Sequence, residues 1–208
     1  MQTFEVVVNI IVIVGIFYLT VVMALVGWIA GLRRGQAVML LPERGEHTWS
    51  IWAHLGLVLI SLVISALLFY ILWIPLPVTI LPTTSVILKI CGLILFLAGL
   101  FLTVWARRTL GSMWGISTSR QVKLLPDHHL VQRGPYRRVR HPMYFGWWIA
   151  LVGLILIYPT WVLVGLLVIS VAIFYRRARL EEAVLAAKFG KEWQAYVAHT
   201  KFLMPFVY

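Results

Sequence analysis

Residues 86–106 read VILKICGLILFLAGLFLTVWA, an apolar run whose only charged residue is Lys89, near its start. A helix crosses the hydrocarbon core of a bilayer with about 20 mostly apolar residues, so this stretch predicts a transmembrane helix. Residues 6–30 and 49–74 have the same character. The chain of 208 residues is 62% hydrophobic and has a mean hydropathy of +0.93, above the range of soluble domains. We therefore expect an integral membrane protein.

Two shorter apolar stretches, residues 143–158 and 160–175, follow a long polar segment. Tyr158-Pro159 separates them, and a proline there indicates the tight turn of a helical hairpin. The sequence thus predicts an all-α protein with five transmembrane helices, a long cytoplasmic loop before the fourth and an amphipathic helix after the fifth. We expect two regions: a three-helix membrane region, 1–106, and a region with the loop, hairpin and C-terminal helix, 107–208.

Basic residues gather in three segments: three lie in residues 31–49, eight in 107–141 and six in 176–208. With five spans, all three segments fall on one side of the membrane, which the positive-inside rule assigns to the cytoplasm. The N-terminus is then outside, and a site built from charged groups faces the cytoplasm. Since these basic residues adjoin the ends of apolar helices, we expect membrane lipids as partners and no nucleic acid.

The first polar block, residues 107–144, contains a connection of about 35 residues, and loops of that length are usually functional or disordered. Its aromatic and aliphatic content argues against disorder. Pro142 suits the first turn of the fourth span, which places His141 at the start of a helix, where backbone amides favour a carboxylate. The alternative is that the basic residues here only anchor a helix end in the headgroup layer: Arg137, Arg138, Arg140 and His141.

The second polar block, residues 176–196, is predicted to continue the fifth span as an amphipathic helix that lies against the loop. Arg177 and Glu181 are four residues apart and share a helix face just beyond the membrane. They form either an exposed salt bridge or a pair in which each member holds one ligand group. The apolar face of this helix recurs at three- and four-residue spacing: Val184, Leu185, Phe189, Trp193, Tyr196 and Val197.

Taken together, these blocks resemble the isoprenylcysteine carboxyl methyltransferase family and the related membrane phospholipid methyltransferases. The resemblance covers residues 121–205, and Trp193 stands where that family more often has tyrosine. The matching elements are, in order, His128-x-Leu130-Val131, Gly134-x-Tyr136, Arg140-His141-Pro142-x-Tyr144-x-Gly146, Glu181-Glu182-x-x-Leu185-x-x-x-Phe189-Gly190-x-x-Trp193-x-x-Tyr196 and Pro205.

This resemblance implies an S-adenosylmethionine-dependent methyltransferase that acts on a lipophilic acceptor entering from the bilayer. We expect the carboxylate of an isoprenylcysteine-like substrate, with a phospholipid amine or another small hydrophobic molecule as the alternative. It implies that Arg177 orients the substrate. We expect residues 107–208 to be the catalytic region and no metal to take part. The cofactor site implied by the resemblance consists of Gln121, His128, His129, Leu130, Val131, Tyr136, His141, Pro142, Met143, Tyr144 and Glu181.

Within that site we expect Glu181 to bind the cofactor's ammonium or ribose hydroxyls and His141 to bind its carboxylate. Tyr136 and Tyr144 would pack around the adenosyl and sulfonium portions. A carboxylate acceptor such as an isoprenylcysteine needs Arg177 for orientation and no general base, because it is already ionised. An amine acceptor, as in a phospholipid, must first lose a proton to a nearby base, for which the candidates are His128, His129 and Glu182.

Two other kinds of protein compete with this reading. A metal enzyme is disfavoured because no two of the six histidines stand three or four residues apart, the spacing that places two ligands on one helix face. A transporter would be expected to carry ionisable groups inside its spans or an inverted repeat, whereas the span interiors offer only the neutral amide of Asn9 and the ionisable Lys89, both near helix ends. A non-catalytic membrane protein of the same architecture remains an alternative that cofactor binding would distinguish.

Overall fold

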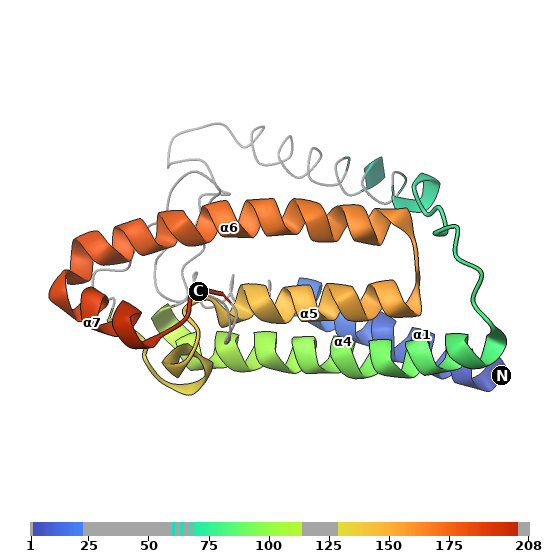
Figure 1. Cartoon of the computed structure of the whole chain (residues 1–208), viewed down its shortest axis with the longest axis horizontal. Coiled ribbons are helices and arrows are strands. Elements are labelled where there is room, and N and C mark those ends of the chain that lie inside the picture. Colours follow the sequence, from blue (N-terminus) through green and yellow to red (C-terminus); the bar gives the residue numbers. More distant parts are fainter. Residues whose placement is uncertain are drawn as a thin grey trace, which may run out of the picture.

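The computed structural model describes residues 2–22, 60, 63–64, 67, 69–113 and 129–203. This part of the chain is helical and contains two isolated backbone bridges but no strand. Its helices are, in order, α1 (Gln2–Phe17) with a π-helical extension η1 (Tyr18–Val22), α4 (Pro82–Leu110), the 3-10 turns η2 (Gly111–Met113) and η3 (Gly134–Arg137), α5 (Pro142–Ile157), α6 (Trp161–Phe189) and α7 (Lys191–His199) (Figure 1).

Three helical stretches of the described chain are long and apolar enough to cross a membrane: Gln2–Val21, Pro82–Leu110 and Trp161–Phe189. Helix α5, at 16 residues, is shorter but equally apolar. Large hydrophobic side chains cover the outside of these helices and are exposed, as expected of surfaces that face lipid. The prediction of an all-helical integral membrane protein is therefore confirmed. The predicted span 49–74 lies largely outside the described residues, so five spans stays a prediction.

The ends of the helices follow local chemistry. Proline occupies the first turn of both α4 and α5, at Pro82 and Pro142, where no backbone donor is needed. Between α5 and α6 the chain turns at Pro159, so the predicted hairpin is confirmed. Helix α6 continues past Tyr175 into the polar block without a break, also as predicted.

The prediction of a single C-terminal amphipathic helix is wrong in one respect, because this part of the chain forms two helices. Gly190, with φ of +48°, ends α6 and begins α7; a side chain would strain this left-handed backbone conformation. Helix α7 then folds back under the end of α6 (Figure 1). Trp193 and Tyr196 therefore do not extend the face formed by Val184 and Phe189 but are buried separately.

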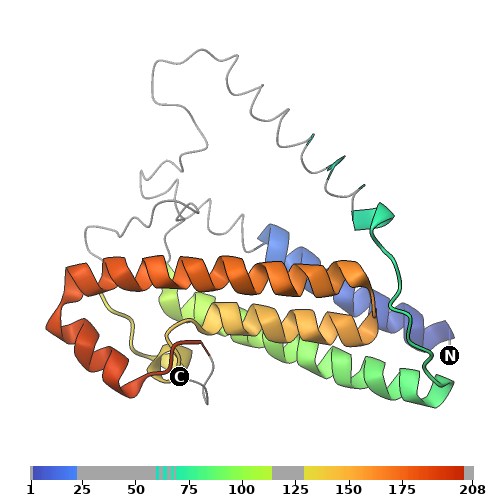
Figure 2. The same cartoon turned by 45° about the horizontal axis from the view of Figure 1, so that its top comes forward.

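Helices α4 and α5 lie side by side, and α6 runs along the other side of α5 (Figures 1 and 2). The α4–α5 contact depends on glycines at matching levels: Gly99 opposite Gly146, and Gly92 opposite Gly153. A Cβ atom added to Gly99 would lie 2.4 Å from the backbone nitrogen of Ala150. Small residues allow such close backbone approach, which is how helices gain packing energy in lipid.

At the end of the bundle opposite the polar blocks, two polar contacts join the described helices. Lys89 of α4 forms an ion pair with Glu5 of α1, and the Tyr158 hydroxyl donates to the Asn9 side chain. These contacts provide partners for Asn9 and Lys89, the two residues that the sequence analysis singled out in the spans.

Candidate active site

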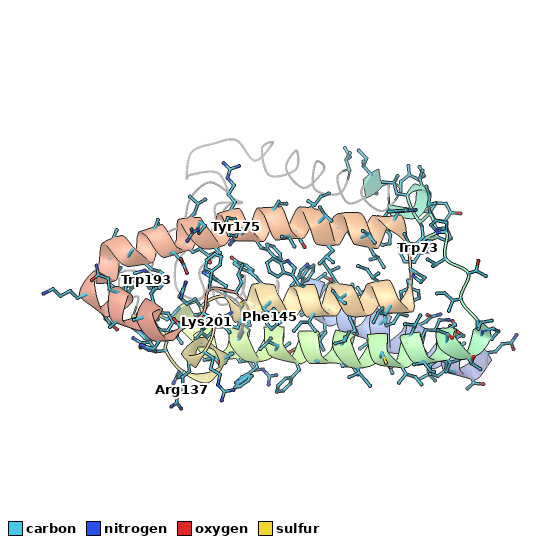
Figure 3. All side chains as sticks on the ribbon, in the orientation of Figure 1. Trp73, Arg137, Phe145, Tyr175, Trp193 and Lys201 are labelled. Carbon is cyan, nitrogen blue, oxygen red and sulfur yellow. The ribbon has the colours of Figure 1, made fainter. Side chains whose placement is uncertain are left out.

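The segment that leads into α5 pairs with the C-terminal segment, residues 200–203. The Lys201 amide donates to the Arg138 carbonyl at 2.9 Å, the Arg140 amide to the Lys201 carbonyl at 2.9 Å, and the His141 amide to the Phe202 carbonyl at 3.3 Å. Figure 3 shows Lys201 close to the start of α5, where Phe145 is labelled. The C-terminal segment thus pairs with the segment before α5 beside the polar end of the helices.

Glu181, on the stretch of α6 beyond Tyr175, is the first centre of the site. Its Oε1 accepts a hydrogen bond from the Tyr144 hydroxyl at 2.7 Å and another from Arg177 Nε at 3.1 Å. His141 Nδ1 lies 3.6 Å from its Oε2. Three predicted site residues, from the start of α5 and the far part of α6, therefore meet at the carboxylate of a fourth, Glu181.

Glu182 is the second centre, next along the same helix. Arg140 Nε donates to its Oε1 at 2.6 Å, and His141 Nε2 lies 3.4 Å from the same oxygen without the alignment of a hydrogen bond. Arg140 also donates through Nη1 to the Thr200 carbonyl at 2.6 Å. His141, with 6% of its surface exposed, is therefore enclosed between two carboxylates.

Aromatic rings surround this charged group. Tyr144 stacks on the His141 ring with 5.6 Å between centroids, and Phe202 meets the same ring edge-on at 5.3 Å. Phe174 of α6 stacks on Tyr144 at 4.7 Å. These rings fix the orientation of the imidazole and connect α5 to α6.

The electrostatics favour charged forms throughout the cluster. Burial of the imidazole acts to lower its pKa, but the interactions with Glu181 and then Glu182 outweigh burial and raise the pKa of His141. Burial likewise acts to raise the pKa values of Glu181 and Glu182, but His141 and the other donors lower both. These shifts favour the protonated form of His141 and the ionised forms of Glu181 and Glu182.

The other predicted site residues lie apart from these carboxylates. Val131 and Tyr136 are buried with Ala106 and Met113, and Met143 packs on that cluster. Burial is the first cause that raises the pKa of Tyr136, followed by the charges of Tyr196 and Glu181. Pro142 is fully buried, Leu130 is half-buried and His129 is exposed, whereas Gln121 and His128 lie outside the described residues.

Sequence reasoning gave Arg140 only an anchoring role and did not identify Thr200 or Phe202 at all. Arg140 and Thr200 are 60 residues apart, and Arg140 and Glu182 are 42 apart. No helical or strand spacing links such positions. The one available signal was that the family resemblance extends as far as Pro205, beyond the last predicted helix.

The site therefore offers partly exposed groups of both signs at the end of the apolar helices. The side chains of Glu181 and Arg177 are 23% and 33% exposed. Adjacent carboxylate and guanidinium groups can bind a zwitterion or two ligands of opposite charge. Among the described residues, no three His, Cys, Asp or Glu side chains gather in a way that could hold a metal ion.

Comparisons with known proteins agree with the motifs. The phospholipid methyltransferase family model matches residues 87–192, whereas no curated protein matches. A solved structure of a eukaryotic intramembrane Ras methyltransferase, an isoprenylcysteine carboxyl methyltransferase, is similar with a TM-score of 0.56 and 22% identity. The match covers 96% of this chain and 74% of that one. The resemblance inferred from the sequence is confirmed, and the structural likeness extends it to the fold.

Proposed function

This chain belongs to the phospholipid methyltransferase family, and we propose that it transfers a methyl group from S-adenosylmethionine to a lipophilic carboxylate such as that of an isoprenylcysteine. The observation that supports this most directly is the convergence of Tyr144, Arg177 and His141 on Glu181. The chain is an integral membrane methyltransferase. Our proposal concerns its cofactor, its acceptor and the cytoplasmic position of its site.

The donor groups fit the cofactor chemically. The methionine part of S-adenosylmethionine carries an ammonium group, for which the partly exposed Glu181 carboxylate is a suitable partner. His141, expected at the cofactor carboxylate, is buried between Glu181 and Glu182. We therefore propose that His141 acts through Glu181, by holding that carboxylate charged and in place.

When bound, the cofactor supplies a methyl group on a sulfonium, which is already activated for transfer. The protein has to orient the acceptor and exclude water. We propose that Arg177, half-buried at the end of the apolar part of α6, binds an acceptor carboxylate that arrives from the lipid. An ionised carboxylate needs no general base, and no covalent enzyme intermediate is required.

A phospholipid amine is the second candidate acceptor, favoured by the name of the matching family model. An ammonium would have to lose a proton before it could attack the methyl group. Glu182 is the other carboxylate of the site, but Arg140 and His141 lie against its Oε1 and Arg179 lies 3.9 Å from its Oε2. Proton removal would have to compete with these contacts, and so we favour the carboxylate acceptor.

The test is to incubate the purified protein with a membrane extract and S-adenosylmethionine labelled in its methyl group. A methyl ester releases labelled methanol in mild base, whereas an N-methylated phospholipid keeps the label on its headgroup. We expect base-labile label in the wild type, greatly reduced in Arg177→Ala and retained in the exposed neighbour variant Arg176→Ala. Base-stable label would show that the acceptor is an amine rather than a carboxylate. If no lipid from any extract becomes labelled, the proposed function is refuted.

A further inference from the structure

The C-terminal segment, residues 200–203, holds the backbone of the site. Its three hydrogen bonds run to residues 138–141, and the last fixes the His141 amide against the Phe202 carbonyl. His141 precedes the first turn of α5, and its side chain makes no capping hydrogen bond to that helix in the described structure. Apart from the stacked ring of Tyr144 on α5, the imidazole is therefore held by tertiary contacts.

Phe202 supplies one of those contacts directly. Its ring meets the His141 ring at 5.3 Å with an interplanar angle of 76°, while Tyr144 stacks on the imidazole at 5.6 Å with an angle of 10°. An edge contact on one side and a parallel ring on another leave the imidazole little freedom to rotate. In this orientation its two nitrogens face Glu181 and Glu182.

The Phe202 ring also contacts two cationic side chains that face Glu182, those of Arg140 and Arg179. The guanidinium of Arg140 lies 5.7 Å from the ring centroid and that of Arg179 lies 5.4 Å from it, both within the range of cation–π attraction. The same two guanidiniums approach Glu182, at 2.6 Å and 3.9 Å. One aromatic side chain thus touches His141 and both arginine partners of Glu182.

Thr200 completes the arrangement from the same segment. Its carbonyl accepts from Arg140 Nη1 at 2.6 Å, and its hydroxyl donates to the Tyr196 carbonyl at 2.6 Å. Tyr196 in turn donates to the Tyr136 carbonyl at 2.7 Å. These bonds anchor the segment between α7 and the turn before α5, so that it forms a fixed support.

We propose that Phe202 is a positioning residue of the active site, which holds His141 between Glu181 and Glu182 and so aims the Glu181 carboxylate at the cofactor. This role rests on the proposed function as regards the cofactor. The positioning of His141 itself does not, because it can be measured without any ligand.

Removal of the ring would have a specific consequence. In Phe202→Ala, water could reach the open side of the imidazole, which could then turn away from one carboxylate. Glu181 would lose a partner that favours its charged form and fixes its direction. Since an aromatic contact of this type contributes a factor of about three to ten in an equilibrium constant, we expect cofactor affinity to fall by about that factor.

The experiment compares Phe202→Ala, the conservative Phe202→Tyr and a control, Phe101→Ala, which removes an exposed ring on the outer face of α4. The first readout, taken without ligand, is the NMR signal of the His141 ring in protein with labelled histidine, identified by its loss in His141→Asn. The second is the dissociation constant of S-adenosylhomocysteine, measured by calorimetry in detergent. Thermal unfolding reports on stability in parallel.

We expect Phe202→Ala to move the His141 signal and its titration midpoint and to weaken S-adenosylhomocysteine binding, with Phe202→Tyr restoring both and Phe101→Ala changing neither. An unchanged His141 signal in Phe202→Ala would overturn the positioning role, whatever the cofactor affinity. A shifted His141 signal together with unchanged affinity would overturn the link to Glu181. Failure of the wild type to bind S-adenosylhomocysteine would instead refute the proposed function and leave the NMR comparison valid.

Discussion

Glu181 is the residue on which the proposed cofactor site depends most. Replacement by glutamine keeps its size and its ability to accept from Tyr144 but removes the charge that faces Arg177 and His141. A hydrogen bond to a charged group is worth about 1.5–3 kcal/mol, so affinity for S-adenosylmethionine should fall by about one to two orders of magnitude in Glu181→Gln. Calorimetry in detergent measures this change.

The matched control is Glu192→Gln on α7, where the exposed carboxylate accepts only from the Gln132 side chain in the described structure. This variant should bind the cofactor like the wild type. Equal affinity in both variants and the wild type would remove Glu181 from the site.

His141 predicts how stability depends on pH. Its pKa in the folded protein is raised above the ordinary value, so its contribution to stability is fully present below the unfolded pKa and is lost as pH rises through the folded pKa. The unfolding temperature should therefore decrease as pH rises above the ordinary histidine pKa of about 6.5 and through the raised pKa of His141. The unfolding temperature of His141→Gln should depend less on pH over this interval. Parallel curves for the two proteins would contradict the interactions of His141 with Glu181 and Glu182.

The acidic side of the same curve reports on Glu181 and Glu182. Their folded pKa values are lowered, so the stability they contribute is present above the ordinary carboxyl pKa and is lost as pH falls through the folded values.

Part of the candidate site could be predicted from the sequence alone, because the Arg177–Glu181 pair follows from four-residue spacing on a helix. The Tyr144–Glu181 bond joins residues 37 apart, and the sequence indicated it only through family resemblance.

The contact between helices α4 and α5 is the structural element most sensitive to a single methyl group. A Cβ at Gly99 would fall 2.4 Å from the Ala150 backbone nitrogen and 2.5 Å from the Gly146 carbonyl oxygen. The helices would have to separate, and overpacking of this kind costs about 1–3 kcal/mol. Gly99→Ala should therefore lower the unfolding temperature in detergent and, by moving the start of α5, reduce methyl transfer.

Gly165 provides the matched control on α6, because an added Cβ there meets nothing within 4 Å. Gly165→Ala should leave the unfolding temperature unchanged or raise it slightly, since alanine favours the helical backbone over glycine by about 0.5–1 kcal/mol. A similar loss in both variants would show that helix propensity, rather than the close approach of α4 and α5, governs the effect.

The orientation of the protein in the membrane can be tested at the two ends of α4. This helix has 29 residues, about 43 Å at 1.5 Å per residue, so its ends extend beyond a hydrocarbon core of about 30 Å. In a Cys91→Ser background, a cysteine at Thr83 should react with a membrane-impermeant maleimide in intact cells. A cysteine at the exposed Arg137, which follows α4 and points outward in Figure 3, should react only after permeabilisation. The reverse pattern would place the active site outside.

The sequence by itself determined the all-helical membrane character, the start of α5 at Pro142 and the hairpin turn at Pro159. These features depend on apolar length and on backbone chemistry, which are properties of neighbouring residues. The tertiary structure alone decided that residues 138–141 pair with residues 200–203 and that His141 lies between Glu181 and Glu182. Those contacts join segments tens of residues apart, and their geometry is set by how the helices pack, which no local pattern encodes.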